Sequence, residues 1–271
     1  MRVMMWCDME GVSCITKWDQ VSAGSIQYQE GRQLYTGDVN AAVRGAKRAG
    51  AKEIIVVDGH GAGGDHTFNS LVKEKLEPGA EYVFGYRWGC YVEPLMSGCD
   101  ALLLPGAHAM AGTPDGVLCH TMSSAQWVDV SINGLKVGES GLVAAIAGSF
   151  DVPVVFVSGD AATVREVKNL VGESVVGATV KVGLGRTAAR CQAPEDAQAL
   201  IEEHVYEALI HRGRWPKPYK VSPPVELRVD LFTPDAAQAF VGRTGCELIG
   251  PRTVVSRGET FWQAWDQFWH R

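Results

Sequence analysis

The residues Arg2-Val3-Met4-Met5-Trp6-Cys7 form an apolar run at the start of the chain, and Asp8-Met9-Glu10-Gly11 follow it directly. A short run of this kind is typical of a strand that is buried on both faces in a parallel sheet. Comparable runs occur further along, at Glu53–Asp58, Glu81–Phe84, Ala101–Leu104, Val128–Ile132 and Val152–Ser158. Because helical patterns separate these runs, the sequence predicts an α/β fold, with a mainly parallel sheet flanked by helices in three layers.

The segments between the runs carry helix and turn signals. We predict helices at Asp38–Ala49, Glu139–Gly148, Asp160–Leu170 and Pro194–His211. Asp38 is the expected N-cap of the first helix, and Gly50 is its expected stop. The pair Asn133-Gly134 predicts a tight turn or hairpin.

The last third of the chain follows a proline-rich stretch, residues 215–224, which has the composition of a linker. After it we predict a strand (Val225–Phe232), a short helix (Pro234–Val241), a strand (Glu247–Ser256) and a terminal helix with one broad aromatic face. Such a face usually packs in a core or against another subunit. We therefore predict an α/β core domain over residues 1–190 and a smaller C-terminal α+β domain over residues 191–271, with a part in oligomerisation.

The overall composition excludes several classes of protein. The 271 residues include 46% hydrophobic and 21% charged residues, which is typical of a folded globular chain. The net charge is −6 and there is no run of Lys and Arg, so we predict no nucleic-acid partner. No apolar run approaches the roughly 20 residues of a membrane span, so we predict no membrane partner and no signal peptide.

The seven cysteines are Cys7, Cys14, Cys90, Cys99, Cys119, Cys191 and Cys246. They are odd in number and contain no CxxC pair, which argues against a disulfide framework and against a thiolate zinc site. We expect free thiols in a reducing compartment, and therefore a cytoplasmic protein.

Two acids stand immediately after the first predicted strand. Side chains alternate along a strand, so Asp8 and Glu10 project to the same side. Two carboxylates this close repel each other and are costly to bury, and a divalent cation between them would remove that cost. The alternative is a pair of solvated loop acids with a helix-capping role.

Two histidines follow other predicted strands in the same way. His60 comes after Glu53–Asp58, and His108 comes after Ala101–Leu104. The carboxyl ends of parallel strands meet at one edge of a sheet, where ligand sites assemble. A mixed set of carboxylates and imidazoles suits zinc, with manganese or cobalt feasible. The predicted core domain is thus also the predicted metal-binding domain.

Two further residues are candidates for the same site. Glu139 opens a predicted helix, where a carboxylate is also favoured by the helix dipole alone. His120 lies in a loop 12 residues after His108, and a histidine there could transfer a proton. Each of the two could equally be structural.

The stretch Gly59-His60-Gly61-Ala62-Gly63-Gly64 satisfies the GxGxxG pattern of dinucleotide-binding proteins. It follows the second predicted strand instead of the first, and a bulky His stands where the backbone should approach a pyrophosphate. We therefore do not favour nucleotide binding. No GxSxG motif supports a serine hydrolase.

With these residues in place, the chain resembles the D-aminopeptidase family of zinc peptidases (DppA-like, M55). The segments that carry the resemblance occur in the family's order: Asp8-Met9-Glu10-Gly11, Glu30-Gly31-Arg32, Asp58-Gly59-His60, Gly106-Ala107-His108-Ala109, His120-Thr121-Met122-Ser123, Gly138-Glu139-Ser140-Gly141-Leu142 and Ser158-Gly159-Asp160. One departure is Val57-Asp58-Gly59-His60, where the family often has Asn-Asp-Ser/Ala-His.

The resemblance implies a site with two zinc ions per subunit. In it Asp8 would bridge the metals, Glu10 would hold the first, and the second would be completed by His60, His108 and Glu139. It implies that His120 is the catalytic residue, which family descriptions assign as a nucleophile. It also implies a homo-oligomer, a decamer of two stacked pentameric rings whose active sites face an inner chamber.

The predicted function is that of a metal-dependent aminopeptidase that removes the N-terminal residue of short peptides, with the preference for D- or L-residues left open. The metals would activate water and polarise the scissile carbonyl, and His120 would act as the proton-transfer group in preference to direct attack. Two alternatives stay open at this point. One is a dinuclear-metal amidase or phosphoesterase, and the other is a non-catalytic Rossmann-type nucleotide-binding module.

Overall fold

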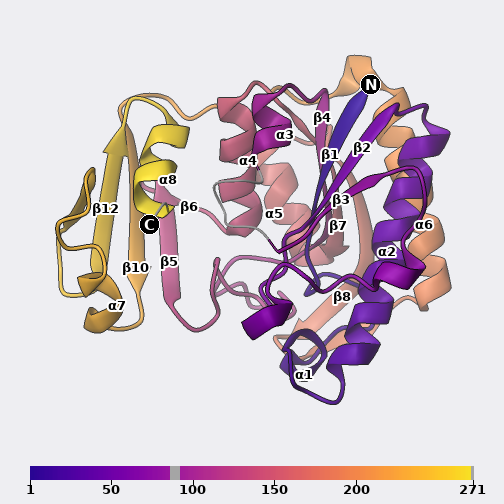
Figure 1. The fold of residues 1–271 in the computed structure, drawn as a ribbon, viewed down its shortest axis with the longest axis horizontal. Helices are drawn as coiled ribbons and strands as arrows, with labels where there is room; N and C mark the ends of the chain where they lie inside the picture. Colours follow the sequence, from indigo (N-terminus) through magenta and orange to yellow (C-terminus); the bar gives the residue numbers. More distant parts are fainter. Residues whose placement is uncertain (86–91, 270–271) are drawn as a thin grey trace.

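The strand β1 (Arg2–Cys7) lies inside a seven-stranded sheet with the order β3-β2-β1-β4-β7-β8-β9 in a computed structural model that describes residues 1–85 and 92–269 (Figure 1). The other strands are β2 (Glu53–Asp58), β3 (Glu81–Val83), β4 (Ala101–Ala107), β7 (Val154–Asp160), β8 (Val176–Gly185) and β9 (Ala188–Cys191). All neighbours pair in parallel except β8 and β9, which are antiparallel. The strand order reverses between β1 and β4, a switch point of the kind where α/β proteins place ligands.

Helices cover both faces of this sheet, as predicted for a three-layer fold (Figure 1). On one face α2 (Tyr28–Arg48) packs against α6 (Pro194–Ile210), and their apolar residues share a cluster with Val3 and Met5 of β1. On the other face lie α4 (Glu139–Ser149) and α5 (Ala161–Val171), which share a second cluster with Met4 and Trp6. The shorter helical segments are α1 (Trp18–Val21), α3 (Glu93–Met96) and the 3-10 turns Gly64–His66, Lys73–Lys75 and Arg212–Arg214.

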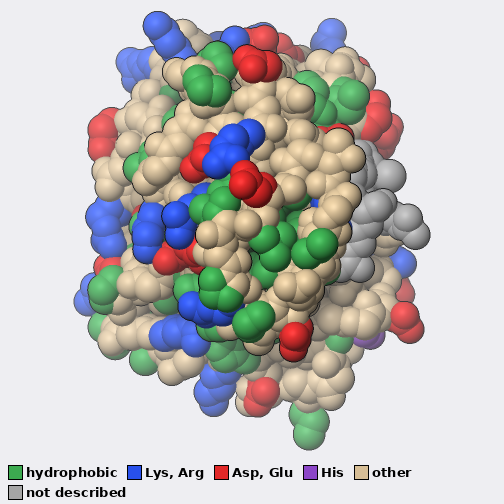
Figure 2. Space-filling model, turned by 90° about the vertical axis from the view of Figure 1, so that its left-hand side faces the viewer, with side chains coloured by type: hydrophobic (Ala, Val, Ile, Leu, Met, Phe, Trp, Pro, Cys, Tyr) green, Lys and Arg blue, Asp and Glu red, His purple; other side chains and the backbone are tan. Residues whose placement is uncertain are grey.

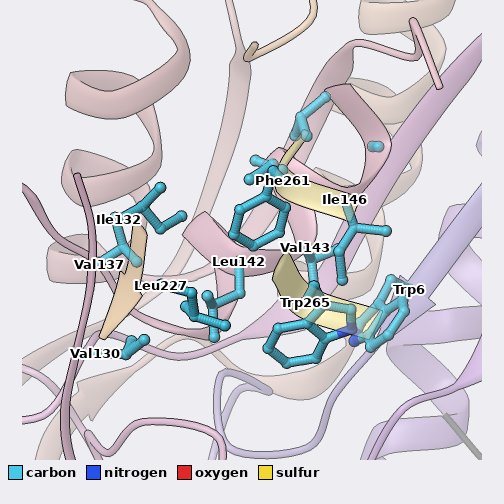
Figure 3. Packing of buried hydrophobic residues seen from close by; sticks show 14 of the residues in the cluster. Trp6, Val130, Ile132, Val137, Leu142, Val143, Ile146, Leu227, Phe261 and Trp265 are labelled. Atoms are coloured by element: carbon cyan, nitrogen blue, oxygen red, sulfur yellow. The ribbon is translucent and has the colours of Figure 1, made fainter. Parts of the chain in front are cut away.

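A second sheet, entirely antiparallel, stands beside the first with the order β11-β12-β10-β5-β6. Its strands are β5 (Trp127–Ile132), β6 (Leu135–Lys136), β10 (Val225–Leu231), β11 (Cys246–Leu248) and β12 (Thr253–Gly258), with α7 (Pro234–Gln238) and α8 (Phe261–Trp269) attached. The helix α8 lies between this sheet and α4. Figure 3 shows its Phe261 and Trp265 among side chains of α4 and of the second sheet.

The outer side of the second sheet differs from its packed side. Figure 2 views the molecule from there and shows acidic and basic side chains interspersed with hydrophobic ones. On this sheet Arg257 of β12 pairs with Glu226 of β10 and with Glu247 of β11, both at 2.8 Å. The apolar residues of this sheet therefore serve mainly its contact with α8.

Most predicted elements are confirmed, since the observed bounds differ from the predicted ones by three residues or fewer. The tight turn is confirmed too, because Asn133 and Gly134 connect β5 to β6 with φ of 49° and 82°. The predicted strand Val128–Ile132 does form, but within the antiparallel sheet. The predicted strand Glu247–Ser256 is divided into β11 and β12, and β8 and β9 were not predicted.

The predicted start of the first long helix is wrong. Asp38 is not its N-cap, because α2 begins ten residues earlier and Asp38 is buried within it. Two glycines weaken the helical pattern in that stretch, and both are sites of close packing. A Cβ on Gly31 would lie 1.9 Å from the backbone O of Gln20, and one on Gly37 would lie 2.3 Å from the side chain of Gln198.

Several expectations concern the whole chain. The second sheet takes β5 and β6 from residues 127–136, and α6 packs on the first sheet. The predicted domain boundary at 190/191 stays a prediction.

The six cysteines within the described part are free, and Cys90 lies outside it. None of the helices formed by the described residues has the length and apolar character needed to span a membrane.

Candidate metal centre

The carboxyl ends of β1, β2 and β4 bring four predicted site residues together. Cys7 pairs with Asp58, and Met5 pairs with Leu103, so the residues that follow the three strands emerge side by side. The four side chains are those of Asp8, Glu10, His60 and His108, and all are at most 6% exposed. The alternative of solvated loop acids is therefore excluded.

Asp8 lies between the two imidazoles. Its Oδ1 is 3.0 Å from His60 Nδ1, and its Oδ2 is 3.4 Å from His108 Nε2. On the first side Glu10 Oε2 is 3.2 Å from His60 Nδ1, and on the second side Glu139 Oε2 is 3.6 Å from His108 Nε2. The geometry thus groups His60 with Glu10 and His108 with Glu139, whereas the resemblance had placed His60 with His108 and Glu139.

Each imidazole is oriented by a backbone carbonyl. His60 Nε2 donates to Val21 O at 2.7 Å, and His108 Nδ1 donates to Ala109 O at 2.9 Å. The other nitrogen of each ring faces the carboxylates. Metal-binding histidines are commonly oriented in this way, with the second N–H held by an oxygen.

The donor set fits a divalent cation. Glu10 Oε2 and His108 Nε2 are buried and have no hydrogen-bond partner among the described residues. Ligand atoms of Asp8, Glu10 and His108 lie within 4.8 Å of one another, and the same holds for His108, His120 and Glu139. Buried polar atoms normally have partners, so unpaired lone pairs that converge on one point indicate a place for a cation. Carboxylate oxygens and imidazole nitrogens suit zinc.

The pKa values show how strongly the cluster favours positive charge. Burial alone would lower the pKa of His108, but Glu139, Asp8 and Glu10 outweigh it and raise that pKa to about 10. The pKa of His60 is likewise raised well above its usual range, because Glu10 and Asp8 outweigh its burial. Burial raises the pKa of the Glu139 carboxyl to about 7.

Two glycines let the loops that carry the ligands approach each other. Asp8 N donates to Pro105 O at 3.0 Å, and Gly11 N donates to Gly106 O at 2.8 Å. A Cβ on Gly11 would lie 1.9 Å from Ala107 O, and Gly106 has φ of +74°, which favours glycine. The close contact of these two loops fixes the relative positions of Asp8 and His108.

A buried lysine that was not predicted from the sequence binds the loop that carries Asp8 and Glu10. Lys181 of β8 is 1% exposed, and its Nζ donates to the carbonyls of Glu10, Val12 and Ile15 at 2.5, 2.8 and 2.6 Å. Burial lowers its pKa to about 8. The ammonium group therefore satisfies three carbonyls of the loop that carries Asp8 and Glu10. An inward-facing Lys in an apolar run is the only sequence signal for it.

The departure from the family pattern at Gly59 has a local explanation. A Cβ there would lie 2.7 Å from Trp6 Nε1 and 2.8 Å from Cys7 O, so Ser or Ala would force a shift. The adjacent Asp58 keeps a structural role, since its Oδ2 accepts from Ser70 N at 2.5 Å and from Leu71 N at 2.9 Å. These bonds hold the loop that follows His60.

His120 stacks on His108, with ring centroids 3.9 Å apart and an interplanar angle of 13°. Its Nδ1 donates to Leu118 O at 2.8 Å, which leaves Nε2 as a proton acceptor. Burial and the neighbouring His108 lower the pKa of His120 to about 3. Trp18 contacts the ring edge-on at a centroid distance of 5.5 Å.

A cavity of about 160 Å³ opens onto these groups. Its walls include Asp8, Glu10, His60, His120 and Glu139, together with Trp18 and Ser123. None of the described residues that line it is an Arg or a Lys. All six predicted site residues are therefore brought together at one cavity or directly behind it.

Comparisons with known proteins show the family of this chain. The model of the D-aminopeptidase family, peptidase family M55, matches residues 1–270. A D-aminopeptidase from Bacillus subtilis (strain 168) is 35% identical over 215 residues, which cover 79% of this chain and 76% of the relative. Among solved structures, the Zn-dependent D-aminopeptidase DppA from Bacillus subtilis, a self-compartmentalizing protease, has a TM-score of 0.89 at 31% identity, covering 99% of this chain and 95% of that chain.

Proposed function

This chain belongs to the D-aminopeptidase family, whose members are metal-dependent hydrolases, and from that premise we propose that it removes the N-terminal residue of short peptides at a site for two zinc ions. The observation that carries the proposal is the convergence of three carboxylates, two of them buried and that of Glu139 largely so, on two buried imidazoles at 3.0–3.6 Å. Without a cation such a cluster is costly to bury, so its presence at the edge of the sheet indicates that it binds metal ions.

The distances support one division of the ligands. Asp8, with one oxygen toward each imidazole, is the proposed bridge. Glu10 and His60 are the proposed ligands of the first ion, and His108 and Glu139 those of the second. Manganese or cobalt suits the same donors.

Zinc in such a site supplies Lewis acidity, which polarises a carbonyl and lowers the pKa of water. The side chains of the protein transfer the proton and position the group that transfers it. His120 accepts a proton at Nε2 from the attacking water and delivers it to the leaving amine, while Leu118 O holds the ring through Nδ1. The stacked His108 keeps the ring parallel to its own.

The alternatives are not favoured. His60 points inward to Asp8, so the Gly59–Gly64 loop does not present the open backbone that a pyrophosphate needs. A site for two metal ions would by itself also suit a phosphoesterase, so the geometry does not decide between these reactions. The family match supports peptide hydrolysis over both.

Assembly and location are proposed on the same premise. The solved relative is a self-compartmentalizing protease, and we propose that this chain also forms a closed homo-oligomer, a decamer of two stacked pentameric rings. Exposed apolar side chains such as Ile26 and Leu184, which are 98% and 74% exposed in the single chain, are candidates for its interfaces. The free thiols favour the cytoplasm.

One experiment tests reaction class, metal dependence and handedness together. Metal-stripped protein would be reconstituted with zinc, manganese or cobalt and assayed on L-Ala-L-Ala and D-Ala-D-Ala, with p-nitrophenyl phosphate as the control substrate. We expect metal-dependent release of alanine from at least one dipeptide and no phosphatase activity. Metal-dependent phosphatase activity without dipeptide hydrolysis would contradict the proposal.

A further inference from the structure

A cationic side chain lies beside the cavity, and none of the acidic side chains that the structure describes pairs with it. Arg186 lies in the turn between β8 and β9 and is exposed. It forms no ion pair within residues 1–85 and 92–269, whereas the guanidinium of Arg165 is bound by Asp115 at 2.8 Å. An unpaired Arg at the edge of an active site is available to a ligand, and its two outer nitrogens match the geometry of a carboxylate.

The position of Arg186 is fixed by the segment that carries His120. Its backbone O accepts from Leu118 N at 2.7 Å, and its Nε donates to Cys119 O at 3.2 Å. These bonds join the Arg to the two residues that precede His120. The Nε bond still leaves the outer guanidinium nitrogens free for a ligand.

Trp18 connects Arg186 to the site. The guanidinium carbon lies 5.1 Å from the Trp18 ring centroid, a cation–π contact. The same ring lines the cavity and is 5.5 Å from His120. The guanidinium of Arg186 and the ring of His120 therefore contact the same tryptophan, which also lines the cavity.

The size of the cavity determines which part of a peptide reaches that charge. A volume of about 160 Å³ equals the space of roughly five water molecules, which is enough for one small residue and the bond to be cut. Each further residue extends the chain by about 3.3–3.6 Å, so the C-terminus of a dipeptide or tripeptide extends to the border of the cavity, which Trp18 helps to form.

We propose that Arg186 binds the free C-terminal carboxylate of the substrate, so that short unblocked peptides are the substrate class of this site. This inference rests on the proposed function and narrows it. Arg186 determines specificity by binding the C-terminal end of the peptide. Other residues act on the scissile bond. A longer or amidated peptide would lack a carboxylate at that place.

The test compares a dipeptide with its amide. Wild type, Arg186→Gln and the matched control Arg190→Gln, an exposed Arg on β9, would be assayed on Ala-Ala and Ala-Ala-amide of the accepted handedness. We expect wild type to prefer the free acid. Arg186→Gln should raise KM for the free acid about tenfold to a hundredfold, the range for loss of a charge-assisted bond, and leave KM for the amide unchanged. Arg190→Gln should behave as wild type.

Three outcomes overturn the inference, and a fourth concerns the function itself. Equal turnover of the free acid and the amide by wild type would overturn the inference. This outcome needs no variant, so the inference can be tested even if Arg186→Gln does not fold. An unchanged KM for the free acid in Arg186→Gln would do the same, as would equal losses on both substrates. Hydrolysis of neither peptide by zinc-loaded wild type would instead contradict the proposed function.

Discussion

The edge of the seven-stranded sheet and the contact between α8 and the five-stranded sheet are both buried, but their side chains are of opposite kinds. The first holds Asp8, Glu10, His60 and His108 with few hydrogen bonds among them. The second holds rings, such as Trp127 and Phe268 with centroids 5.3 Å apart. Burying aromatic area stabilises a fold, whereas burying unpaired charge destabilises it. The cluster of acids and imidazoles lowers the free energy of unfolding and serves function, whereas the aromatic contact of α8 raises the free energy of unfolding.

The largest expected effect is the loss of the proposed bridging carboxylate. Asp8→Ala should reduce metal content to background and lower kcat/KM at least about a thousandfold, because the metal supplies several kcal/mol of transition-state stabilisation. Because Asp8 also pairs with His60 and His108, its loss should lower the free energy of unfolding of the metal-free protein as well. Metal analysis, dipeptide assays and denaturation check these points. Asp235→Asn, an exposed acid on α7, is the control, and full metal content in Asp8→Ala would contradict the assignment.

The next effect separates a proton-transfer group from a ligand. His120→Ala should lower kcat about 10²- to 10⁴-fold, the usual contribution of general acid–base catalysis, with metal content close to that of wild type. His211→Ala, at the exposed end of α6, should change neither quantity. If the His120 variant were depleted of metal, His120 would be a ligand, as its place near His108 and Glu139 would also allow.

The aromatic region should respond in the opposite manner. Trp265 is 1% exposed, and Trp265→Ala should lower the free energy of unfolding by about 3–5 kcal/mol, the cost of truncating a buried ring. Metal content and KM of the folded fraction should stay as in wild type. Urea denaturation and metal analysis test this, with Gln263→Ala on the exposed side of α8 as control. A loss of metal in folded Trp265→Ala would show that the two regions are not independent.

The smallest effect concerns Asp38, a buried acid of α2 outside the ligand cluster. Burial raises its pKa to about 7, against the Ser13 backbone and the charge of Lys181, which lower it. The folded state therefore holds a proton between about pH 4 and pH 7 that the unfolded state has lost. The free energy of unfolding should fall as pH rises through this window, by at most about 1.4 kcal/mol per pH unit from this group.

Asp38→Asn removes that titration. Its stability relative to wild type should increase from pH 4 to pH 7 and then level off. Urea denaturation at several pH values measures the difference. Two stability curves that run parallel over this range would contradict the assignment of the slope to Asp38.

The residues at strand ends could be predicted because their signals are local. An apolar run that stops at Asp8, or at the Gly before His60, marks both the strand and its end, and parallel pairing then brings the ends together. Lys181 could not be predicted in the same way. Glycines interrupt the β-rich pattern of β8, and the lysine's three carbonyl partners lie about 170 residues earlier in the chain.

The sequence also could not predict which strands pair with each other. Val128–Ile132 has the pattern of a strand, but nothing local distinguishes a place in the parallel sheet from its actual place beside β10. The predicted helix began at Asp38, whereas α2 begins at Tyr28 and contains Gly31 and Gly37, which weaken the helical pattern. Both are explained only by the packing partners Gln20 and Gln198, which tertiary structure supplies.

The central claim is that this edge of the sheet holds a pair of metal ions. Anomalous diffraction at the zinc edge, from crystals of zinc-loaded protein, tests it most directly. We predict two peaks per chain, one contacted by Asp8, Glu10 and His60 and the other by Asp8, His108 and Glu139. The absence of peaks between these residues, or peaks only at surface sites, would contradict the account.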